Sequence, residues 1–173
     1  MTRPDWETYY LSLCFHIAER SPDPDTKHGT IFVAPDHTPL SFGYNGFPRG
    51  CDDSMIPLTR PEKYSWIVHA EEAAIDNAAK HGMAALNGST VYSTGCPCAR
   101  CARGIINAGA IAVICGPVES FCIDAAEKEL VIKMLSSHRP PIPLIEKKLH
   151  ECDVVQLLTK ARDRAMRERD KEA

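Results

Sequence analysis

Hydrophobic residues near the start of the chain recur at helical spacing and predict an amphipathic helix over residues 5–20. The residues that share its apolar face are Trp6, Tyr9, Tyr10, Leu13 and Ile17. Asp5 stands where an N-cap is expected, because a carboxylate there can accept hydrogen bonds from the first free amides of the helix. Pro22 and Pro24 end the helix and begin a loop. We expect the aromatic stripe to belong to the core.

Two short β-type runs follow the helix, and a long polar segment comes after them. Residues 30–34 and 40–44 predict the strands of a hairpin, with residues 35–39 as the turn. Residues 46–64 are rich in proline, glycine and aspartate, which is typical of a loop. Loops of this length are usually functional or mobile, and the pattern does not decide between the two.

β-type and helical patterns alternate along the next part of the chain. They predict helices over residues 69–80 and 97–109 and strands over residues 89–93 and 110–115. The last of these strands is an unbroken apolar run, which is typical of a strand buried on both faces of a partly parallel sheet. This alternation predicts an α/β layered domain.

Helical patterns continue towards the end of the chain. A helix is predicted over residues 121–135. Its expected apolar face is made by Ile123, Ala126, Leu130 and Met134. A proline cluster limits residues 144–145 to an edge strand at most. Asp153 is a candidate N-cap of a last helix, in a C-terminal extension over about residues 150–170.

Composition limits the class of protein. The chain has 173 residues, 44% hydrophobic and 25% charged, as in an ordinary soluble globular protein. We expect a single domain over residues 1–173, with a core over about residues 5–137 and a C-terminal helical extension. The net charge of −3 argues against a general nucleic-acid binder, which would carry a basic face. No apolar run approaches the length of a membrane helix and residues 1–6 lack the apolar core of a signal peptide, so we expect a cytoplasmic protein.

The chain has eight cysteines, and in a cytoplasmic protein these are reduced thiols or metal ligands. Three of them fall in apolar segments and are most simply core residues: Cys14, Cys115 and Cys122. The pattern assigns no role to Cys51. Cys96 precedes Pro97 and could line a pocket, but the proline turns the chain away and disfavours Cys96 as a metal ligand.

Two short motifs hold the residue types of a catalytic zinc site. Cys98 and Cys101 lie on the first turn of a predicted helix, so both thiolates can bind one ion. His69, at the start of an alanine-rich helix, is the third candidate ligand. Three protein ligands leave one tetrahedral position for water, as in a catalytic zinc site. Glu71 is close enough to touch that water. Taken alone, the cysteine pair would also fit a redox pair or half of a structural zinc site.

The two motifs together resemble a known family. His-x-Glu followed by Pro-Cys-x-x-Cys is the signature of zinc-dependent deaminases, and here it reads HAE at residues 69–71 and PCARC at residues 97–101. The chain therefore resembles the cytidine deaminase superfamily. Residues 42–53, FGYNGFPRGCDD, resemble the GYNG segment of deoxycytidylate (dCMP) deaminases. The likeness runs over about residues 21–117.

The resemblance implies a fold, a reaction and an assembly. The fold would be a three-layer α/β/α arrangement around a mixed five-stranded sheet. The reaction would be the zinc-dependent hydrolysis of dCMP to dUMP and ammonia, which supplies dUMP for thymidylate synthesis. The assembly would be a homo-oligomer, either a hexamer or a trimer or dimer.

The resemblance also implies roles for single residues. Glu71 would take a proton from water, pass it to ring nitrogen N3 and help ammonia leave, with a pKa raised by a dry pocket. Asn45 would hold the sugar, although a turn asparagine with positive φ is the alternative. Ala70 would be a further substrate contact. The monophosphate needs cations or backbone amides, and the pattern does not choose among Lys27, His28, Arg49 and Arg60.

Some positions depart from the family pattern. Ala73 stands where many relatives have asparagine, and His28 precedes Gly29 where valine is usual. Neither change affects the zinc ligands or Glu71, so we still expect the activity of the family. The departures leave the exact substrate and the regulation undecided. Arg100, between the cysteines, would either add a positive charge or face solvent, and Glu72 is expected at the surface.

Regulation is a further expectation from the family. Regulated members bind nucleotide triphosphates near the long loop, so dCTP and dTTP are candidate effectors. Asp52 and Asp53 would either hold a Mg²⁺ ion with such an effector or be solvated. We expect no second zinc ion, because Cys51 has no histidine near it in the loop.

Two other functions remain open at the level of sequence. One is deamination of another cytosine nucleotide, such as a 5-modified dCMP, or of a base in nucleic acid. The low net charge and the lack of an aromatic and basic surface pattern count against nucleic acid. The other is a non-catalytic zinc fold that senses nucleotides. Glu71 argues against this second function, because a site that only binds has no use for a carboxylate that carries protons.

Overall fold

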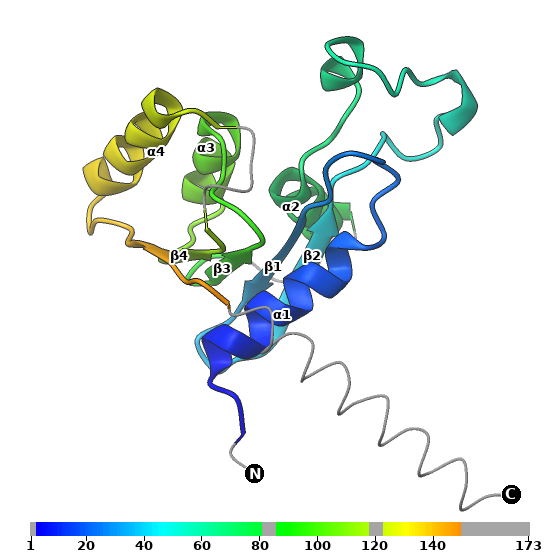
Figure 1. Ribbon diagram of the computed structural model, residues 1–173. Coiled ribbons are helices and arrows are strands. Elements are labelled where there is room, and N and C mark those ends of the chain that lie inside the picture. The colour runs from blue at the N-terminus through cyan, green and yellow to red at the C-terminus, as the bar shows by residue number, and fades with distance from the viewer. Residues whose placement is uncertain (1–2, 81–85, 118–122, 150–173) are drawn as a thin grey trace, which may run out of the picture.

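The computed structural model describes residues 3–80, 86–117 and 123–149, and in these ranges one mixed sheet forms the centre of the molecule (Figure 1). Its strands are β1 (Gly29–Val33), β2 (Pro39–Tyr44), β3 (Thr90–Ser93), β4 (Ala112–Cys115) and β5 (Leu144–Glu146). The helices are α1 (Trp6–Ala18), α2 (Ala70–Lys80), α3 (Ala99–Asn107) and α4 (Ala125–Ser137). The hairpin, the α/β alternation and the edge position of residues 144–145 are confirmed.

The order and directions of the strands determine where a site can form. The order is β2-β1-β3-β4-β5. β1 is antiparallel to both β2 and β3, whereas β3, β4 and β5 are parallel to one another. β2, β3 and β4 therefore all end at the same end of the sheet. α2 follows β2 and the long loop, and α3 follows β3, so both helices begin at that end, where open α/β sheets usually bind ligands.

Helices cover both faces of the sheet. On one face, α1 packs against alternate sheet residues that include Ile31, Val33 and Tyr92. On the other face, α2, α3 and α4 pack against Phe32 and Val113 with their neighbours. Successive strand residues point to opposite faces, which explains why Ile31 and Phe32 belong to different clusters. This is the three-layer α/β/α arrangement with a mixed five-stranded sheet that the family resemblance implies.

Glycine allows two close approaches between helix and sheet. A Cβ atom on Gly29 would lie 2.1 Å from the carbonyl oxygen of Cys14 in α1. A Cβ atom on Gly43 would lie 2.4 Å from the backbone nitrogen of Ala74 in α2. The second approach holds the first turns of α2 against β2, and so helps to position the start of α2.

The aromatic stripe of α1 is only partly buried, so the prediction that it belongs to the core is partly wrong. Tyr10 is buried, but Trp6 and Tyr9 are 39% and 45% exposed. Trp6 stacks on His37, with ring centroids 4.2 Å apart, outside the sheet. Asp5 is the N-cap as predicted, because its side chain accepts a hydrogen bond of 2.8 Å from the backbone nitrogen of Thr8.

The predicted apolar face of α4 is also partly wrong. Val131 and Leu135 are the buried residues of this helix, while Leu130 is 44% exposed. Apolar residues occupy several adjacent rows of α4, and the row that faces α3 and the sheet contains Val131 and Leu135. Asp153 with its predicted helix, and Cys122, lie outside the described residues.

The long loop between β2 and α2 contains two short 3₁₀ turns, Asp53–Met55 and Glu62–Ser65. It projects from the body at the upper right of Figure 1. Near its base, Gly46 and Val68 form an isolated antiparallel bridge. Within residues 3–80, 86–117 and 123–149, no helix is both long and apolar enough to cross a bilayer.

Candidate metal centre and pocket

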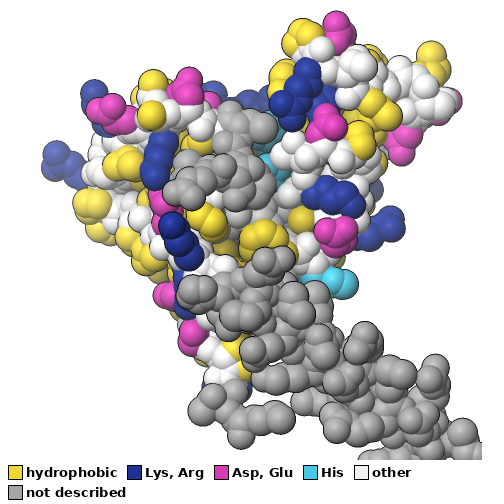
Figure 2. All heavy atoms as spheres, in the orientation of Figure 1, with side chains coloured by type: hydrophobic (Ala, Val, Ile, Leu, Met, Phe, Trp, Pro, Cys, Tyr) yellow, Lys and Arg dark blue, Asp and Glu magenta, His cyan; other side chains and the backbone are white. Residues whose placement is uncertain are grey.

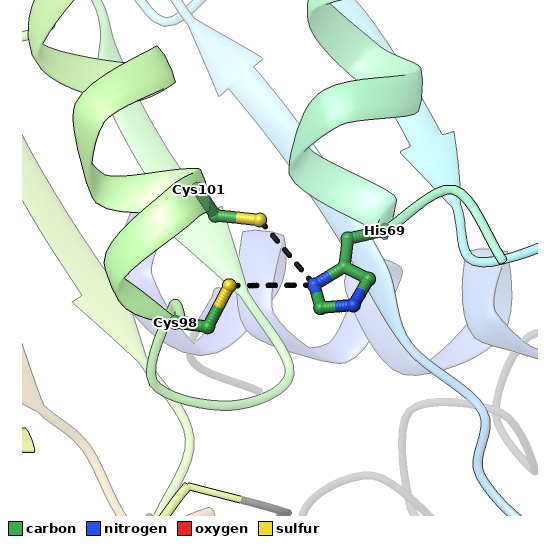
Figure 3. Close-up of side chains that lie close together, drawn as sticks. All are labelled: His69, Cys98 and Cys101. Carbon is green, nitrogen blue, oxygen red and sulfur yellow. Dashed lines mark hydrogen bonds between the residues drawn. The ribbon is translucent and has the colours of Figure 1, made fainter. Parts of the chain in front are cut away.

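One histidine and two cysteines converge where α2 and α3 begin (Figure 3). His69 directly precedes α2, Cys98 is the N-cap residue of α3, and Cys101 lies in the first turn of α3. Nδ1 of His69 is 3.5 Å from Sγ of Cys98 and 3.5 Å from Sγ of Cys101. All ligand atoms of the cluster lie within 4.8 Å of one another.

This spacing fits a tetrahedral zinc ion. Zinc–nitrogen bonds of about 2.0–2.1 Å and zinc–sulfur bonds of about 2.3 Å, at a tetrahedral angle, separate nitrogen from sulfur by about 3.5 Å. The distances from His69 to the two sulfurs match this value. The donor set of one imidazole and two thiols is also one that zinc prefers. The two nitrogen–sulfur distances and the residue types therefore suit a zinc ion.

Contacts within the ligand cluster shift the pKa values of its members. A hydrogen bond with Cys101 lowers the pKa of Cys98 to about 3. Burial opposes this shift, and His69 adds to it. The same contact raises the pKa of the Cys101 thiol. A hydrogen bond with Cys98 raises the pKa of His69, against the effect of burial. A divalent cation binds here by replacing the protons of these groups, because zinc ligands are deprotonated.

Glu71 is a buried carboxyl group beside the cluster. It lies in the first turn of α2 and is 7% exposed. Burial raises its pKa, while its own backbone amide and His69 oppose the rise. Its side chain also contacts the Cys101 thiol. A carboxyl group with a raised pKa can both accept and release a proton near neutral pH.

A cavity of about 490 Å³ opens in front of the cluster. Its lining includes His69, Ala70, Glu71 and Cys98 from the two helix starts. The long loop, the segment after α1 and the start of α4 supply the remaining walls, which include Asp23, Thr26, His28, Asn45, Lys63, Tyr64, Ile67 and Glu127. In Figure 2 a histidine is visible inside a notch in the surface, and Lys and Arg side chains border this notch near the top.

Asn45 is buried in this lining and connects two backbone segments. Its Oδ1 accepts a hydrogen bond of 2.7 Å from the backbone nitrogen of His28, and its Nδ2 donates one of 2.8 Å to the carbonyl oxygen of Thr26. The register of β1 with β2 explains the contact, because Gly29 pairs with Tyr44. Among the described non-glycine residues only His37 has a positive φ, so the reading of Asn45 as a turn residue with positive φ is wrong.

His28 lies beside Asn45 and faces the same cavity. Its Nδ1 is 3.2 Å from Oγ1 of Thr94, the residue after β3. Burial lowers the pKa of His28 to about 4. The positive charge on His69 lowers this pKa further, whereas Asp23 raises it. His28 is therefore a neutral imidazole at pH 7.

Of the four candidate phosphate contacts, His28 lines this cavity, whereas Lys27, Arg49 and Arg60 do not. Nζ of Lys27 lies 3.1 Å from a carboxylate oxygen of Glu19. Arg49 donates a hydrogen bond of 2.5 Å to Asn77 and borders a separate hollow of about 580 Å³. Ala70, by contrast, does line the cavity.

Arg100 lines the cavity and forms an ion pair with Glu72. The pair joins the first turn of α3 to the first turn of α2, the two helices that carry the ligand cluster. Arg100 is 55% exposed and Glu72 is 40% exposed, so both lie at the surface. Glu127 of α4 accepts a hydrogen bond of 3.0 Å from the backbone nitrogen of Ala99. This contact satisfies one free amide at the start of α3, where Cys98 makes no side-chain cap.

Lys63 is a pocket residue that sequence reasoning missed. Its ammonium group is buried and lies 3.1 Å from Oδ1 of Asp23 and 2.7 Å from Oδ2 of Asp25. Hydrogen bonding to Asp25 raises the pKa of Lys63, against the effect of burial. Nothing in the polar segment around Lys63 distinguishes it from a surface lysine. Only the fold brings it to two aspartates about 40 positions earlier in the chain.

The other candidate residues have simpler surroundings. Cys14 and Cys115 are buried, as expected for core residues, and Cys51 is exposed. Cys96 lines the cavity and hydrogen-bonds with Cys115, which lowers its pKa despite burial. The ligand cluster in the described part of the chain is His69, Cys98 and Cys101 without Cys96. The Asp52 side chain accepts hydrogen bonds from the backbone nitrogen and hydroxyl of Ser54.

Comparison with known proteins identifies the same region. Residues 4–117 match the family described as the cytidine and deoxycytidylate deaminase zinc-binding region. A probable deoxycytidylate deaminase of Drosophila melanogaster is 36% identical over 115 residues, which cover 60% of this chain and 55% of that protein. The deoxycytidylate deaminase of Mus musculus is 35% identical over 116 residues, 64% of each chain. The match thus spans less than two thirds of these relatives.

Solved structures share the fold. The dCMP deaminase of cyanophage S-TIM5, solved in complex with dCMP and dUMP, superposes with a TM-score of 0.65 at 21% identity. The superposition covers 85% of this chain and 100% of the phage protein. The same phage protein in its apo form gives the same TM-score of 0.65.

Proposed function

Because the chain belongs to the cytidine and deoxycytidylate deaminase zinc-binding family, we propose that it is a zinc-dependent hydrolase that converts dCMP to dUMP and ammonia. The observation that carries the proposal is the position of a buried carboxyl group, Glu71, beside a His-Cys-Cys cluster that borders a cavity. The names of the relatives and of the phage structure support dCMP as the substrate. The product would supply thymidylate synthesis.

His69, Cys98 and Cys101 would hold the zinc ion. When bound, zinc supplies a Lewis acid that lowers the pKa of a water molecule to about 7, so that a nucleophile is available at neutral pH. The starts of α2 and α3 assist the protein ligands, because the positive end of a helix dipole favours anionic sulfur.

Glu71 would move the protons of the reaction. It takes one proton from the attacking water and delivers it to N3 of the cytosine ring while C4 gains its new oxygen. It then carries the second water proton to the amino group, which leaves C4 as ammonia. The buried position of Glu71 supports this role, because burial raises the pKa of the carboxyl group towards the range in which it both accepts and donates.

Other chain groups would orient the nucleotide. The backbone amide of Ala70 belongs to the first turn of α2, where helix amides have no partner within the helix, and it is a contact for the base. Asn45 would bind the sugar hydroxyl, because its amide already lies in the lining and each of its polar groups can make a second hydrogen bond. The limited volume of the cavity, about 490 Å³, supports a small-molecule substrate.

Regulation and assembly are part of the proposal. We propose dCTP and dTTP as effectors, together with Mg²⁺, in the hollow bordered by Arg20, Arg49 and Asp53. Asp53 is the better Mg²⁺ candidate, because the Asp52 side chain caps a 3₁₀ turn. A homo-oligomer is supported by Phe42, which is 55% exposed on the edge strand β2. A cytoplasmic location is supported by the six free thiols of the described residues.

The test is ammonia release by the zinc-loaded chain from dCMP, cytidine, dCTP, 5-methyl-dCMP and a single-stranded oligonucleotide. We expect the highest kcat/KM with dCMP. Turnover of 5-methyl-dCMP or of the oligonucleotide without turnover of dCMP would establish one of the alternative substrates. Nucleotide binding without any ammonia release would instead indicate a sensor.

A further inference from the structure

The cavity needs a positive charge for the phosphate of a nucleotide, yet its two lining cations are already paired. Lys63 is buried against two carboxylates, 3.1 Å from Asp23 and 2.7 Å from Asp25. Its hydrogen bonds to both aspartates leave little capacity for another anion. Arg100 is paired with Glu72 in the contact that joins α3 to α2. Lys63 cannot bind a phosphate without breaking one of these hydrogen bonds. Arg100 keeps free N–H donors, but it stands between Cys98 and Cys101, at the metal cluster where the base is expected.

Arg60, in the long loop, is not part of the cavity lining but contacts two residues that are. Its Nη2 donates a hydrogen bond of 3.3 Å to Oγ1 of Thr26, and its guanidinium carbon lies 5.8 Å from the ring centroid of Tyr64. Thr26 and Tyr64 both line the cavity. These two contacts hold the guanidinium group beside the lining and limit its freedom before any ligand arrives.

The positive charge of Arg60 is more available than that of its neighbours. Its Nε is 4.0 Å from Oδ2 of Asp25, at the limit of an ion pair, and 49% of its side chain is exposed. The same Asp25 oxygen lies only 2.7 Å from Lys63. The Asp25 side chain keeps its contact with Lys63 and is itself 51% exposed, so Arg60 can exchange its long contact for a phosphate without leaving a buried charge unpaired.

The order of residues along the wall matches the order of groups in a nucleotide. His28 and the candidate zinc ligand His69 line the same cavity. Asn45 bridges His28 to Thr26, and Thr26 leads to Arg60 beside the lining. A base at the cluster and a sugar at Asn45 thus direct the 5′-phosphate towards Thr26 and Arg60.

We propose that Arg60 binds the 5′-phosphate and determines the preference for a nucleoside monophosphate over a nucleoside. The proposal rests on the proposed deaminase function and adds a specificity-determining residue to it. An arginine suits the task, because its planar guanidinium group can donate two parallel hydrogen bonds to phosphate oxygens.

The test compares kcat/KM for dCMP with kcat/KM for deoxycytidine in zinc-loaded wild type and Arg60→Gln. We expect the ratio of the two constants to fall by about 10- to 100-fold in the variant, mainly through a higher KM for dCMP. Arg60→Lys should recover part of the ratio, because it restores the charge but not the paired donors. Arg103→Gln, which removes an exposed arginine of α3, is the control for net charge and should keep the wild-type ratio.

Three outcomes would overturn the assignment. An unchanged ratio in Arg60→Gln, with dCMP turnover intact in the wild type, would reject the role of Arg60 and leave the deaminase function standing. A fall in the ratio for Arg49→Gln but not for Arg60→Gln would indicate that the phosphate binds in the separate hollow beside Arg49. Absence of turnover in the wild type with both substrates would reject the deaminase function and, with it, this inference. Thermal unfolding of each variant shows whether it is folded.

Discussion

The ammonium group of Lys63 lies 3.1 Å from Oδ1 of Asp23, and the two side chains are only 2% and 3% exposed. Lys63 belongs to the loop between β2 and α2, whereas Asp23 belongs to the segment after α1. Both residues line the cavity. The pair therefore joins two segments, far apart in sequence, that form the cavity wall.

Removing Asp23 should destabilise the protein. Asp23→Asn leaves the buried ammonium of Lys63 with Asp25 as its remaining carboxylate, so we expect the free energy of unfolding at pH 7 to fall by about 2 kcal/mol. Urea unfolding measures the change. The matched control is Glu19→Gln in the exposed Lys27–Glu19 pair, which should change stability by less than about 1 kcal/mol. Equal effects of the two substitutions would contradict the importance of the buried pair.

The same pair predicts a dependence of stability on pH. Burial alone would raise the pKa of Asp23, but hydrogen bonds from Asp25, Lys63 and Thr26 outweigh it and the pKa is lowered. A lowered carboxyl pKa stabilises the fold at pH values above the ordinary pKa of about 3.9, and the contribution is lost as the pH falls through the lowered value. The raised pKa of Lys63 gives stability that is lost only as the pH rises beyond about 10.5.

Unfolding as a function of pH tests this assignment. The difference in stability between wild type and Asp23→Asn should be constant between about pH 5 and 9 and should narrow below about pH 4. A difference that stays constant down to pH 2 would show that the Asp23 carboxylate is not its cause.

Glu71→Gln should separate metal binding from catalysis. Glutamine has nearly the same shape but cannot carry a proton, so we expect a full zinc content and a fall in kcat of about 10²- to 10⁴-fold with dCMP. Metal analysis and ammonia release measure the two effects. Glu72→Gln is the matched control on the next position of α2 and should retain most of the activity. Wild-type turnover in Glu71→Gln would remove Glu71 from the mechanism.

The cysteines should differ sharply in their effect on zinc content. Cys98→Ser removes a ligand and should lose both the metal and the activity. Cys96→Ser should retain one zinc ion per chain, because Cys96 contacts Cys115 and is not in the ligand cluster. Metal analysis after dialysis against a weak chelator measures this difference. Loss of zinc from Cys96→Ser alone would mean that the ligand set is wrong.

Gly43→Ala tests how α2 is positioned. The new methyl group would lie 2.4 Å from the Ala74 nitrogen, and we expect a loss of about 1–3 kcal/mol of stability together with reduced activity. Gly46→Ala is the control, because its nearest atom beyond the chain neighbours is a Pro22 side-chain carbon at 3.4 Å. Thermal unfolding compares the two variants. Comparable losses would show that close packing at Gly43 is unimportant.

Much of the architecture follows from local pattern. Two short β-type runs with a turn between them predict the β1–β2 hairpin, and the proline cluster predicts the edge position of β5. Adjacent apolar rows on one helix do not show which row will be buried, and this is why Leu130 was assigned to the core although Val131 and Leu135 occupy it. That choice depends on α3 and the sheet, which are distant in sequence.

The ligand residues could be identified from sequence because His69, Cys98 and Cys101 stand at helix starts with characteristic spacing. Lys63 has no such signal, and the sequence names Arg60 only as one of four candidate phosphate contacts. Their surroundings depend on contacts with Asp23, Asp25 and Thr26, which only the folded chain brings within reach. The ligand cluster and the lining residues His28, Asn45 and Ala70 could therefore be named from the sequence, whereas the buried Lys63 could not.

X-ray absorption at the zinc edge of the purified wild-type protein tests the central claim most directly. Coordination by His69, Cys98 and Cys101 predicts two sulfur neighbours at about 2.3 Å and lighter nitrogen or oxygen neighbours at about 2.0–2.1 Å. Three or four sulfur neighbours, or none, would contradict the site.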